Sequence, residues 1–204
     1  IRKKVPIVYL NIWDSVPAPQ YNEEFYESCD ALLGISKQTV NINKLVLGDK
    51  AENKIISYVP HGLNHKFFFP IDEKHPEFEN LKEFKKQLFK GKEYKFTAIF
   101  NSRNIRRKQV SDVILSWRIF CDKIGEEKAK ECALVLHTQA MDEHGTDLLA
   151  LTEYLCPDYC NVIISDARLA TNQMNYLYNS VDAGILLSSN EGWGLMRSEE
   201  HTSE

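Results

Sequence analysis

The sequence predicts an α/β protein built from two doubly wound, parallel-sheet domains. Short apolar runs rich in β-branched residues alternate along the chain with segments of helical periodicity. The runs are apolar throughout, which is typical of parallel strands that are covered on both faces. A stretch dense in charge, at 71–95, separates the earlier runs from the later ones. These three observations together indicate two Rossmann-like domains.

Seven runs have the length and composition of strands. We expect strands over 6–12, 31–35, 54–59, 95–100, 133–137, 161–165 and 183–188. Two of the segments between them carry a helical stripe. Apolar residues recur every three to four positions from Val110 to Ile124 and again from Met174 to Val181. Thr171 stands where the second of these helices needs an N-cap.

The charge-dense stretch at 71–95 marks the expected domain boundary. It carries Phe78, Leu81, Phe84 and Leu88 at helical spacing, so we expect a surface helix that opens the second domain. A solvated linker is the alternative. With the boundary near Pro70, the expected domains are 1–70 and 71–196.

Charge and hydropathy exclude two classes of protein. The formal net charge of −4 gives no reason to expect the clustered basic face that binds nucleic acid. No apolar run approaches the ~20 residues of a membrane-spanning helix. The first residues, IRKKVPIVYLNIW, resemble a signal peptide, but a Pro and an Asn interrupt them and a cleavage site is missing, which favours a strand. The chain begins without Met, so we expect residues upstream.

The five cysteines are scattered along the chain. An odd, dispersed set does not form a disulfide framework, which favours a cytoplasmic protein, with contact to a membrane surface left open. Cys156 and Cys160 could be half of a metal site. No second Cys or His pair stands at zinc spacing, so a loop with two buried thiols is favoured, and no metal is expected.

The segment SSNEGWGL, at 188–195, directly follows the last expected strand. Gly192 and Gly194 let the backbone pass close to a ligand, and free N–H groups at the start of the next helix favour an anion such as phosphate. Glu191 stands beside them as an acceptor for hydroxyl groups. Taken alone the pattern is weak, because a structural tight turn uses the same residues.

A second polar segment, NSRNIRRK at 101–108, follows the first strand of the second domain. Ligands of open α/β sheets bind at the carboxyl ends of strands, so the cations of this segment stand at the edge of the sheet where a ligand would bind. Arg106 and Arg107 are better explained as solvated residues. His137 stands at the carboxyl end of an expected strand, and Asp14 follows another. His137 could face a ligand, whereas a turn role for Asp14 explains that residue equally well. We interpret HTQAMDEHGTD, at 137–147, as a polar loop and not as a metal site.

Together these segments resemble the retaining glycosyltransferases of the GT-B fold that are called glycosyl transferases group 1. In that family an Arg and a Lys separated by four residues hold the donor diphosphate, and Arg103 and Lys108 have that spacing. The family's Glu-Gly-Phe-Gly-Leu matches 191–195, with Trp193 in place of Phe. VPHGLN at 59–64 resembles the crossing between the two domains, with His61 replacing Asn, and CDALLGIS at 29–36 resembles a strand that ends in a Ser helix cap.

The resemblance implies an enzyme that moves a sugar from a nucleotide-diphosphate sugar to a glycan, lipid or small-molecule acceptor, with retention of configuration. Arg103 and Lys108 would stabilise charge on the leaving diphosphate, and Glu191 would hold the sugar hydroxyls, as catalytic residues. The donor would also contact a further set of residues: Gly192, Trp193, Gly194, Leu195, His61 and Gly62. The family needs no metal, and the nucleotide sugar is a substrate and not a cofactor.

The resemblance also implies that both GT-B domains are incomplete in this chain. A catalytically inactive, nucleotide-sugar-binding fragment is therefore the alternative function. A Rossmann oxidoreductase is a weaker one, since G-x-G-x-x-G follows the first strand of neither domain.

The last eight residues, RSEEHTSE at 197–204, are unusual. The codons AGA TCG GAA GAG CAC ACG TCT GAA translate to them, and that string is similar to a common sequencing-library adapter. We therefore expect 197–204 to be a non-native tail. Glu199 stands where the family has a second carboxylate, eight positions after Glu191, but an adapter-derived Glu199 would have no function. A genuine acidic tail is the alternative.

Overall fold

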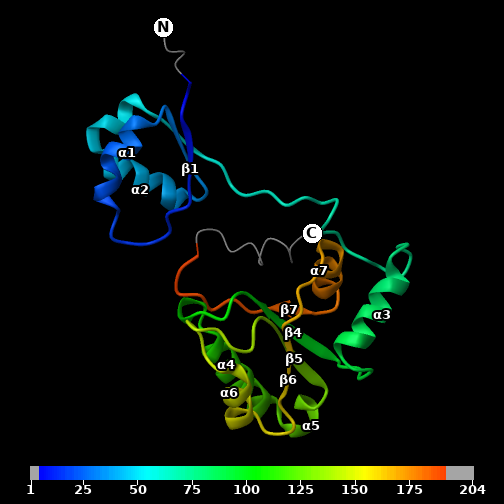
Figure 1. Ribbon diagram of the computed structural model, residues 1–204. Coiled ribbons are helices and arrows are strands. Elements are labelled where there is room, and N and C mark those ends of the chain that lie inside the picture. The colour runs from blue at the N-terminus through cyan, green and yellow to red at the C-terminus, as the bar shows by residue number, and fades with distance from the viewer. Residues whose placement is uncertain (1–4, 192–204) are drawn as a thin grey trace. The chain divides into compact units, whose positions relative to one another are not determined.

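The computed structural model describes residues 5–191 and divides them into two compact units (Figure 1). Among the described residues, the first unit contains the chain up to Gly62 together with Asn190 and Glu191, and the second spans Leu63–Ser189. The glycine-rich residues 192–195 and the tail at 197–204 lie outside the described residues. Both units contain a parallel sheet, as the sequence predicts.

The first unit has a three-stranded parallel sheet in the order β1-β2-β3. Its strands are β1 (Val8–Asn11), β2 (Ala31–Gly34) and β3 (Ile55–Tyr58). Short 3₁₀ helices, η1 (Gln20–Asn22) and η2 (Gly48–Asn53), and the helices α1 (Glu23–Ser28) and α2 (Lys37–Leu47) connect them. The Ser36 hydroxyl accepts the Thr39 N–H at 3.0 Å, which confirms the predicted Ser cap at the start of α2.

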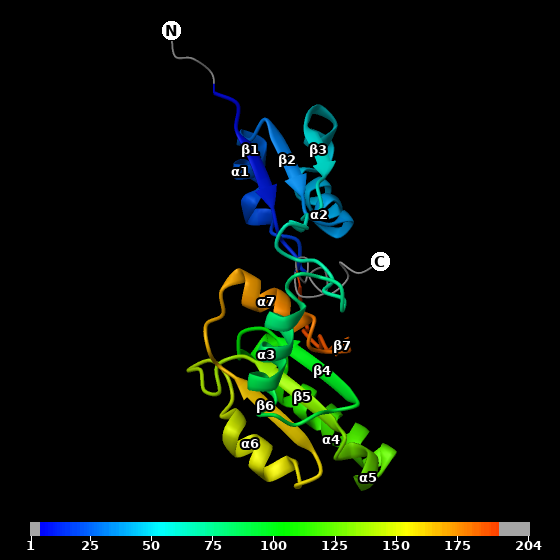
Figure 2. The ribbon, with the colours of Figure 1, turned by 90° about the vertical axis from the view of Figure 1, so that its right-hand side faces the viewer.

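The core of the first unit lies on one face of its sheet. Leu32 packs there against Tyr26 of α1 and against Ile42 and Val46 of α2. Figure 2 shows both helices behind the three strands.

On β1 and β3, apolar residues that alternate with this core set remain exposed, with Val8 58%, Leu10 43% and Ile55 67% exposed. Parallel strands are normally covered on both faces. Within the described residues of this unit, helices cover only one face, so the two-sided cover predicted from the apolar runs is not found here.

The second unit has a four-stranded parallel sheet in the order β6-β5-β4-β7. The strands are β4 (Phe96–Asn101), β5 (Cys132–His137), β6 (Asn161–Ser165) and β7 (Ala183–Gly184). β4 and β5 pair in register from Phe96↔Cys132 to Asn101↔His137. β7 is shorter than the predicted run at 183–188, because it pairs with β4 only at Ala98 and Ile99.

Helices cover both faces of this second sheet (Figure 1). The helices are α3 (Phe78–Leu88), α4 (Val110–Ile124), α5 (Glu126–Ala129), α6 (Leu148–Leu155) and α7 (Thr171–Tyr178), with η3 (Arg106–Lys108) before α4. Phe100 and Leu134 point to one core, with α4 and α6, whereas Ile99 and Val135 point to the other, with α7. This alternation places α3 and α7 opposite α4 and α6.

The segment that enters the second unit is fastened to α7. The Phe69 N–H donates to Asn175 Oδ1 at 3.1 Å, and the Ile71 N–H donates to Asn179 Oδ1 at 2.8 Å. The Asn179 amide in turn donates to the Phe69 carbonyl at 3.1 Å. The change of unit therefore falls at Gly62, a little before the Pro70 boundary expected from sequence.

Two predicted helix features can be compared with the structure. The stripe of α3 is confirmed, because Leu81 is buried and Phe84 packs beside it. The N-cap of α7 was predicted one residue too late. The helix begins at Thr171 with Ala170 as its N-cap, and Gln173 Oε1 accepts the Ala170 N–H at 2.9 Å.

Candidate functional site

The strand order of the second unit reverses at β4. β5 pairs with one side of β4, and β7 pairs with the other. In open α/β sheets, ligands bind outside the carboxyl ends of the strands at such a switch point. The two polar segments singled out from the sequence leave β4 and β7 at this edge. The structure joins them directly, because the Ser189 N–H donates to the Arg107 carbonyl at 2.9 Å.

The loop after β4 is held in place by Asn104, which is 1% exposed. Its amide donates to the carbonyls of Thr146 at 2.7 Å and Gln139 at 3.3 Å, and its Oδ1 accepts the Thr146 N–H at 3.2 Å. The Arg106 N–H also donates to the His144 carbonyl at 3.2 Å. The polar loop at 138–147 therefore acts as the support of the basic loop.

Gly145 makes that support possible. A Cβ on Gly145 would lie less than 3.0 Å from the backbone and side-chain oxygens of Asn104, a distance that real Cβ atoms essentially never show. The two loops can pack this closely only because the position carries no side chain.

Asp142 orients the guanidinium of Arg103. Arg103 Nε donates to Asp142 Oδ2 at 2.8 Å and Nη2 donates to Oδ1 at 3.2 Å, a two-pronged pair. The Asp142 side chain is 3% exposed and that of Arg103 is 59% exposed. The hydrogen bond and charge of Arg103 hold the pKa of Asp142 below its usual value, and the same pair raises the pKa of Arg103. The cation is thus presented to solvent from a fixed anchor.

The other basic residues of the loop differ in burial. Arg106 and Arg107 are exposed. Lys108 is half-buried at the end of η3. Gln109, which follows, has a left-handed φ of 51° and sets the sharp entry into α4. Arg103 and Lys108 therefore belong to one short, tightly turned loop at the switch point.

A cleft of about 550 Å³ opens beside Arg103. It lies over the carboxyl ends of β4, β5 and β6. Its lining consists of the last residue of each strand and the two residues after it: Asn101, Ser102, Arg103, His137, Thr138, Gln139, Ser165, Asp166 and Ala167. Ligand sites of proteins commonly have a volume of this order. The lining is mostly polar, with one cation at its rim.

His137 is the titratable group deepest in this cleft. Its Nδ1 lies 3.1 Å from the Ser165 hydroxyl. Burial lowers the pKa of His137 below its usual value, and a hydrogen bond with the Ser165 backbone opposes this only in part. The imidazole is therefore neutral at neutral pH and offers a ligand one donor or acceptor nitrogen.

Two buried hydroxyls at this edge have no hydrogen-bond partner among the described residues. They are Thr138 Oγ1, in the lining of the cleft, and Ser188 Oγ, just past β7. Buried polar groups are nearly always paired with protein, water or a ligand. Their position suits a polar ligand at the ends of β4, β5 and β7.

The structure places the remaining predicted site residues as follows. Glu191 is half-buried and follows Ser189 by two positions. His61 and Gly62 lie in the irregular segment after β3. Gly192, Trp193, Gly194 and Leu195 lie outside the described residues. Asp14 accepts the Ser15 hydroxyl at 3.0 Å, as a turn residue does.

Sequence reasoning missed Asn104, Asp142 and Gly145 as parts of the site. Asp142 and Gly145 were interpreted only as members of a polar loop. Their signal was present but ambiguous, since Asn, Asp and Gly are also the ordinary residues of turns. His137, in contrast, was noted as facing a possible ligand, and it lines the cleft.

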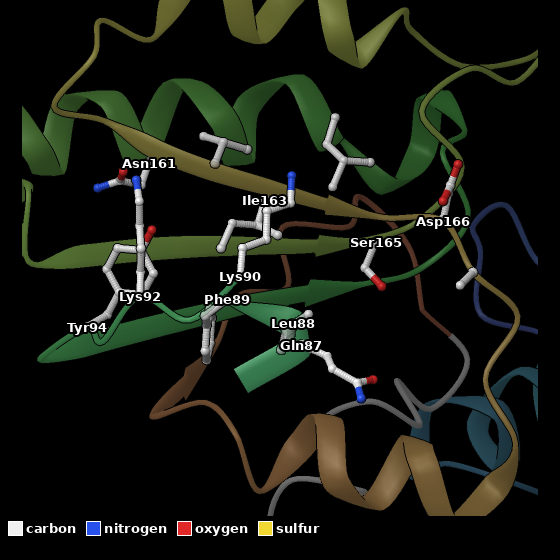
Figure 3. Close-up of a pocket in the computed structure, with 13 residues that line it drawn as sticks. Gln87, Leu88, Phe89, Lys90, Lys92, Tyr94, Asn161, Ile163, Ser165 and Asp166 are labelled. Atoms are coloured by element: carbon white, nitrogen blue, oxygen red, sulfur yellow. The ribbon is translucent and has the colours of Figure 1, made fainter. Parts of the chain in front are cut away.

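A second cleft, of about 500 Å³, lies against β6 (Figure 3). Lys90, Lys92 and Tyr94 approach it from the loop after α3, across from Ile163. Except at Ser165–Ala167, which line both clefts, it shares no residue with the first. None of the site residues predicted from sequence lines it.

Two negative findings concern residues 5–191 alone. No group of three or more His, Cys, Asp or Glu side chains is placed to hold a metal ion there. No helix in that range is long and apolar enough to cross a membrane.

No protein-family model matches the chain, and no curated protein matches it by sequence. Solved structures do match. The Anabaena protein HepE, solved in complex with UDP and glucose, matches with a TM-score of 0.68 at 13% identity, over 96% of this chain and 50% of HepE. An α,α-trehalose-phosphate synthase (UDP-forming) from Burkholderia vietnamiensis matches with a TM-score of 0.67 at 8% identity, over 98% of this chain and 51% of the synthase.

The C-terminal domain of a glycosyl transferase group 1 family protein, LpcC, from Francisella tularensis matches with a TM-score of 0.50 at 16% identity, over 70% of this chain and 67% of that domain. The chain spans about half the length of HepE and of the Burkholderia synthase. At identities this low, the structural matches establish a shared fold and nothing more. The two parallel-sheet units have the fold of partial GT-B, Rossmann-like domains.

Proposed function

We propose that the protein from which this chain comes transfers a sugar from a nucleotide-diphosphate sugar to an acceptor, with retention of configuration. The observation that carries the proposal is the anchored Arg103 at the switch point. Its cation stands at the rim of a polar cleft, at the edge where α/β sheets bind ligands.

The free donors of Arg103 suit a diphosphate. A guanidinium has five N–H groups, and Asp142 accepts from two of them. The remaining donors and most of the side-chain surface face solvent. Because Asp142 fixes the plane of the group, little rotamer entropy is lost when phosphate oxygens bind.

We assign the nucleoside end of the donor to the 550 Å³ cleft. The neutral His137, the Thr138 hydroxyl and the Ser165 hydroxyl provide hydrogen-bonding groups there. The diphosphate would then lie between Arg103 and the segment after β7. HepE was solved with UDP and with UDP-glucose, which supports a ligand of this class.

The chemistry follows from the charge that develops during the reaction. When the bond between the sugar and the diphosphate breaks, negative charge collects on the phosphate oxygens. Arg103 and Lys108 would stabilise that charge from fixed positions, and the loss of one such donor typically lowers kcat by about 10²–10³. Glu191 would hold hydroxyls of the donor sugar, with 192–195 and His61 and Gly62 as further donor contacts.

We further propose that the acceptor is a sugar-containing glycan, lipid or small molecule, and that the reaction requires no metal or further cofactor. A trehalose-phosphate synthase from Burkholderia xenovorans was solved with glucose-6-phosphate, which supports a sugar acceptor. We place the protein in the cytoplasm, with peripheral contact to a membrane surface left open.

A calorimetric titration with UDP, GDP and ADP tests the proposal. We expect one nucleotide to bind, and we expect Arg103→Ala to weaken its binding at least about tenfold, since a hydrogen bond to a charged group contributes ~1.5–3 kcal/mol. Arg106→Ala is the matched control, because Arg106 is an exposed cation of the same loop. If both variants bind as the wild type does, or if no nucleotide binds the folded chain, the proposal fails.

A second candidate function is binding without catalysis. The exposed apolar face of the first sheet, with Val8, Leu10 and Ile55, supports it, because such a face is covered in a complete parallel-sheet domain. We expect the chain alone to bind nucleotide without turnover. Release of sugar or nucleotide from the donor by the chain alone would contradict this second candidate.

A further inference from the structure

The turn between α6 and β6 carries two cysteines, Cys156 and Cys160. The Cys156 N–H donates to the Thr152 carbonyl at 2.8 Å and ends α6. The Cys160 N–H donates to the Pro157 carbonyl at 2.8 Å, which closes a tight turn over 157–160. Cys160 belongs to the core formed with α4 and β5, and Cys156 packs against the same core. The tight turn therefore keeps the two cysteines, four positions apart, close together.

The two thiols differ in exposure. Cys160 is 5% exposed and packs in the core beneath α4, whereas Cys156 is half-buried at the margin of that core. Cys160 shares this core with Cys121, which is 0% exposed. A reagent from solvent can therefore reach Cys156 first, with Cys160 directly behind it.

The turn is fixed to α4 by a polar cluster. Arg118 donates to the Leu155 carbonyl at 2.8 Å and lies over the Tyr159 ring, with its guanidinium carbon 5.6 Å from the ring centroid. Asp122 accepts both the Arg118 Nε, at 2.8 Å, and the Tyr159 hydroxyl, at 2.7 Å. These contacts on both sides of Cys156 keep the turn in one conformation.

The surroundings also shift the pKa values of the two thiols in opposite directions. The neighbouring Cys160 thiol and the charge of Arg118 lower the pKa of Cys156. The neighbouring Cys156 thiol and burial raise the pKa of Cys160. Because Cys156 is also the more exposed of the two, we expect the thiolate, which is the nucleophile in thiol–disulfide exchange, to form there.

We propose that Cys156 and Cys160 form a redox-active dithiol that a small-molecule disulfide oxidises to an intramolecular disulfide. The Cys156 thiolate attacks one sulfur of the reagent, forms a mixed disulfide and releases one thiolate. Cys160 loses its proton and attacks the Cys156 sulfur, which forms the Cys156–Cys160 bond and releases the second thiolate. Two protein thiols are oxidised, and one reagent disulfide is reduced to two thiols.

This site is distinct from the candidate ligand site. Cys160 directly precedes β6, so the dithiol lies at the amino ends of the strands, while Arg103 and His137 lie at the carboxyl ends. The inference therefore does not depend on the proposed transferase.

The test uses the folded, fully reduced chain and oxidised glutathione as the reagent. After the reaction, free thiols are alkylated in acid-quenched samples and located by peptide mass mapping. We expect a Cys156–Cys160 link and alkylation of the three other cysteines out of five. Cys29 and Cys132, both buried, serve as internal controls in the same sample.

Variants separate the two steps. Cys160→Ser should stop with one glutathione attached to Cys156, and Cys156→Ser should stay unmodified at Cys160, while circular dichroism confirms that both variants are folded. The inference is overturned if the folded wild type forms no link, if it stops at the mixed disulfide, if the link joins Cys121 to Cys160, or if the link forms only in denaturant. The wild-type map decides among these outcomes even if a variant does not fold.

Discussion

Replacing Gly145 with Ala tests how the basic loop is held. The added Cβ would collide with both oxygens of Asn104. The flexible end of a side chain could move away cheaply, but one of these oxygens belongs to the backbone and the other accepts the Thr146 N–H. The loop at 138–147 must therefore shift, and Asn104 must lose part of its hydrogen bonding.

The expected loss of unfolding free energy follows from these contacts. Overpacking of a tight site costs ~1–3 kcal/mol, and each lost hydrogen bond adds ~1 kcal/mol. We expect Gly145→Ala to lower the free energy of unfolding by about 2–3 kcal/mol and the Tm of a unit of this size by about 7–11 °C. Nucleotide affinity should fall as well, because Asp142 and Arg103 lie on the displaced loops.

Thermal and urea denaturation measure the loss of stability, and calorimetry measures the loss of nucleotide affinity. Glu143→Ala is the control, since the Glu143 side chain is 79% exposed in the same loop and forms an ion pair with the exposed His144. If Gly145→Ala leaves both stability and affinity at the wild-type level, the loop at 138–147 does not support the basic loop as described.

Two further predictions concern stability. Burial lowers the pKa of His137, so the unfolded chain takes up the proton first as the pH falls below about 6.5. The wild type should therefore lose stability below that pH relative to His137→Gln. Equal urea-denaturation profiles of the two proteins from pH 7 to 5 would refute the burial of a neutral imidazole. Thr97 and Asp182 join the starts of β4 and β7, because Asp182 Oδ2 accepts the Thr97 N–H at 2.7 Å and its hydroxyl at 2.8 Å. Asp182→Ala should therefore lower the unfolding free energy by ~1–3 kcal/mol in the same assay, whereas Asp158→Ala, in the turn before β6, should leave it unchanged.

Much of the fold could be predicted from local pattern. Runs such as 133–137 and 161–165 became β5 and β6, because a buried parallel strand must be apolar on both faces. The stripe from Val110 to Ile124 became α4 with the same bounds. The extent of β7 could not be predicted in this way, since a strand is defined by its ladder and β4 pairs with only two of its residues.

The sequence indicated the edge of the sheet where the candidate site lies, but not the side-chain contacts that hold its loops in place. The rule that ligands bind at the carboxyl ends of strands drew attention to Arg103 and His137, and both line the cleft at that edge of the sheet. The pairing of Arg103 with Asp142 spans 39 positions, and no periodicity or local motif encodes a side-chain contact over that distance. Asn104 was likewise unpredictable, because its partners are backbone groups of a loop that only the folded sheet brings near.

Hydrogen–deuterium exchange with and without UDP, GDP or ADP tests the central claim most directly, because it locates bound nucleotide on the chain. We predict slower exchange in peptides covering 101–109, 137–147 and 185–191 when the nucleotide that binds is present. Protection confined to 87–94 and 161–164, which line the cleft of Figure 3, would contradict a diphosphate site at the carboxyl ends of β4 and β7.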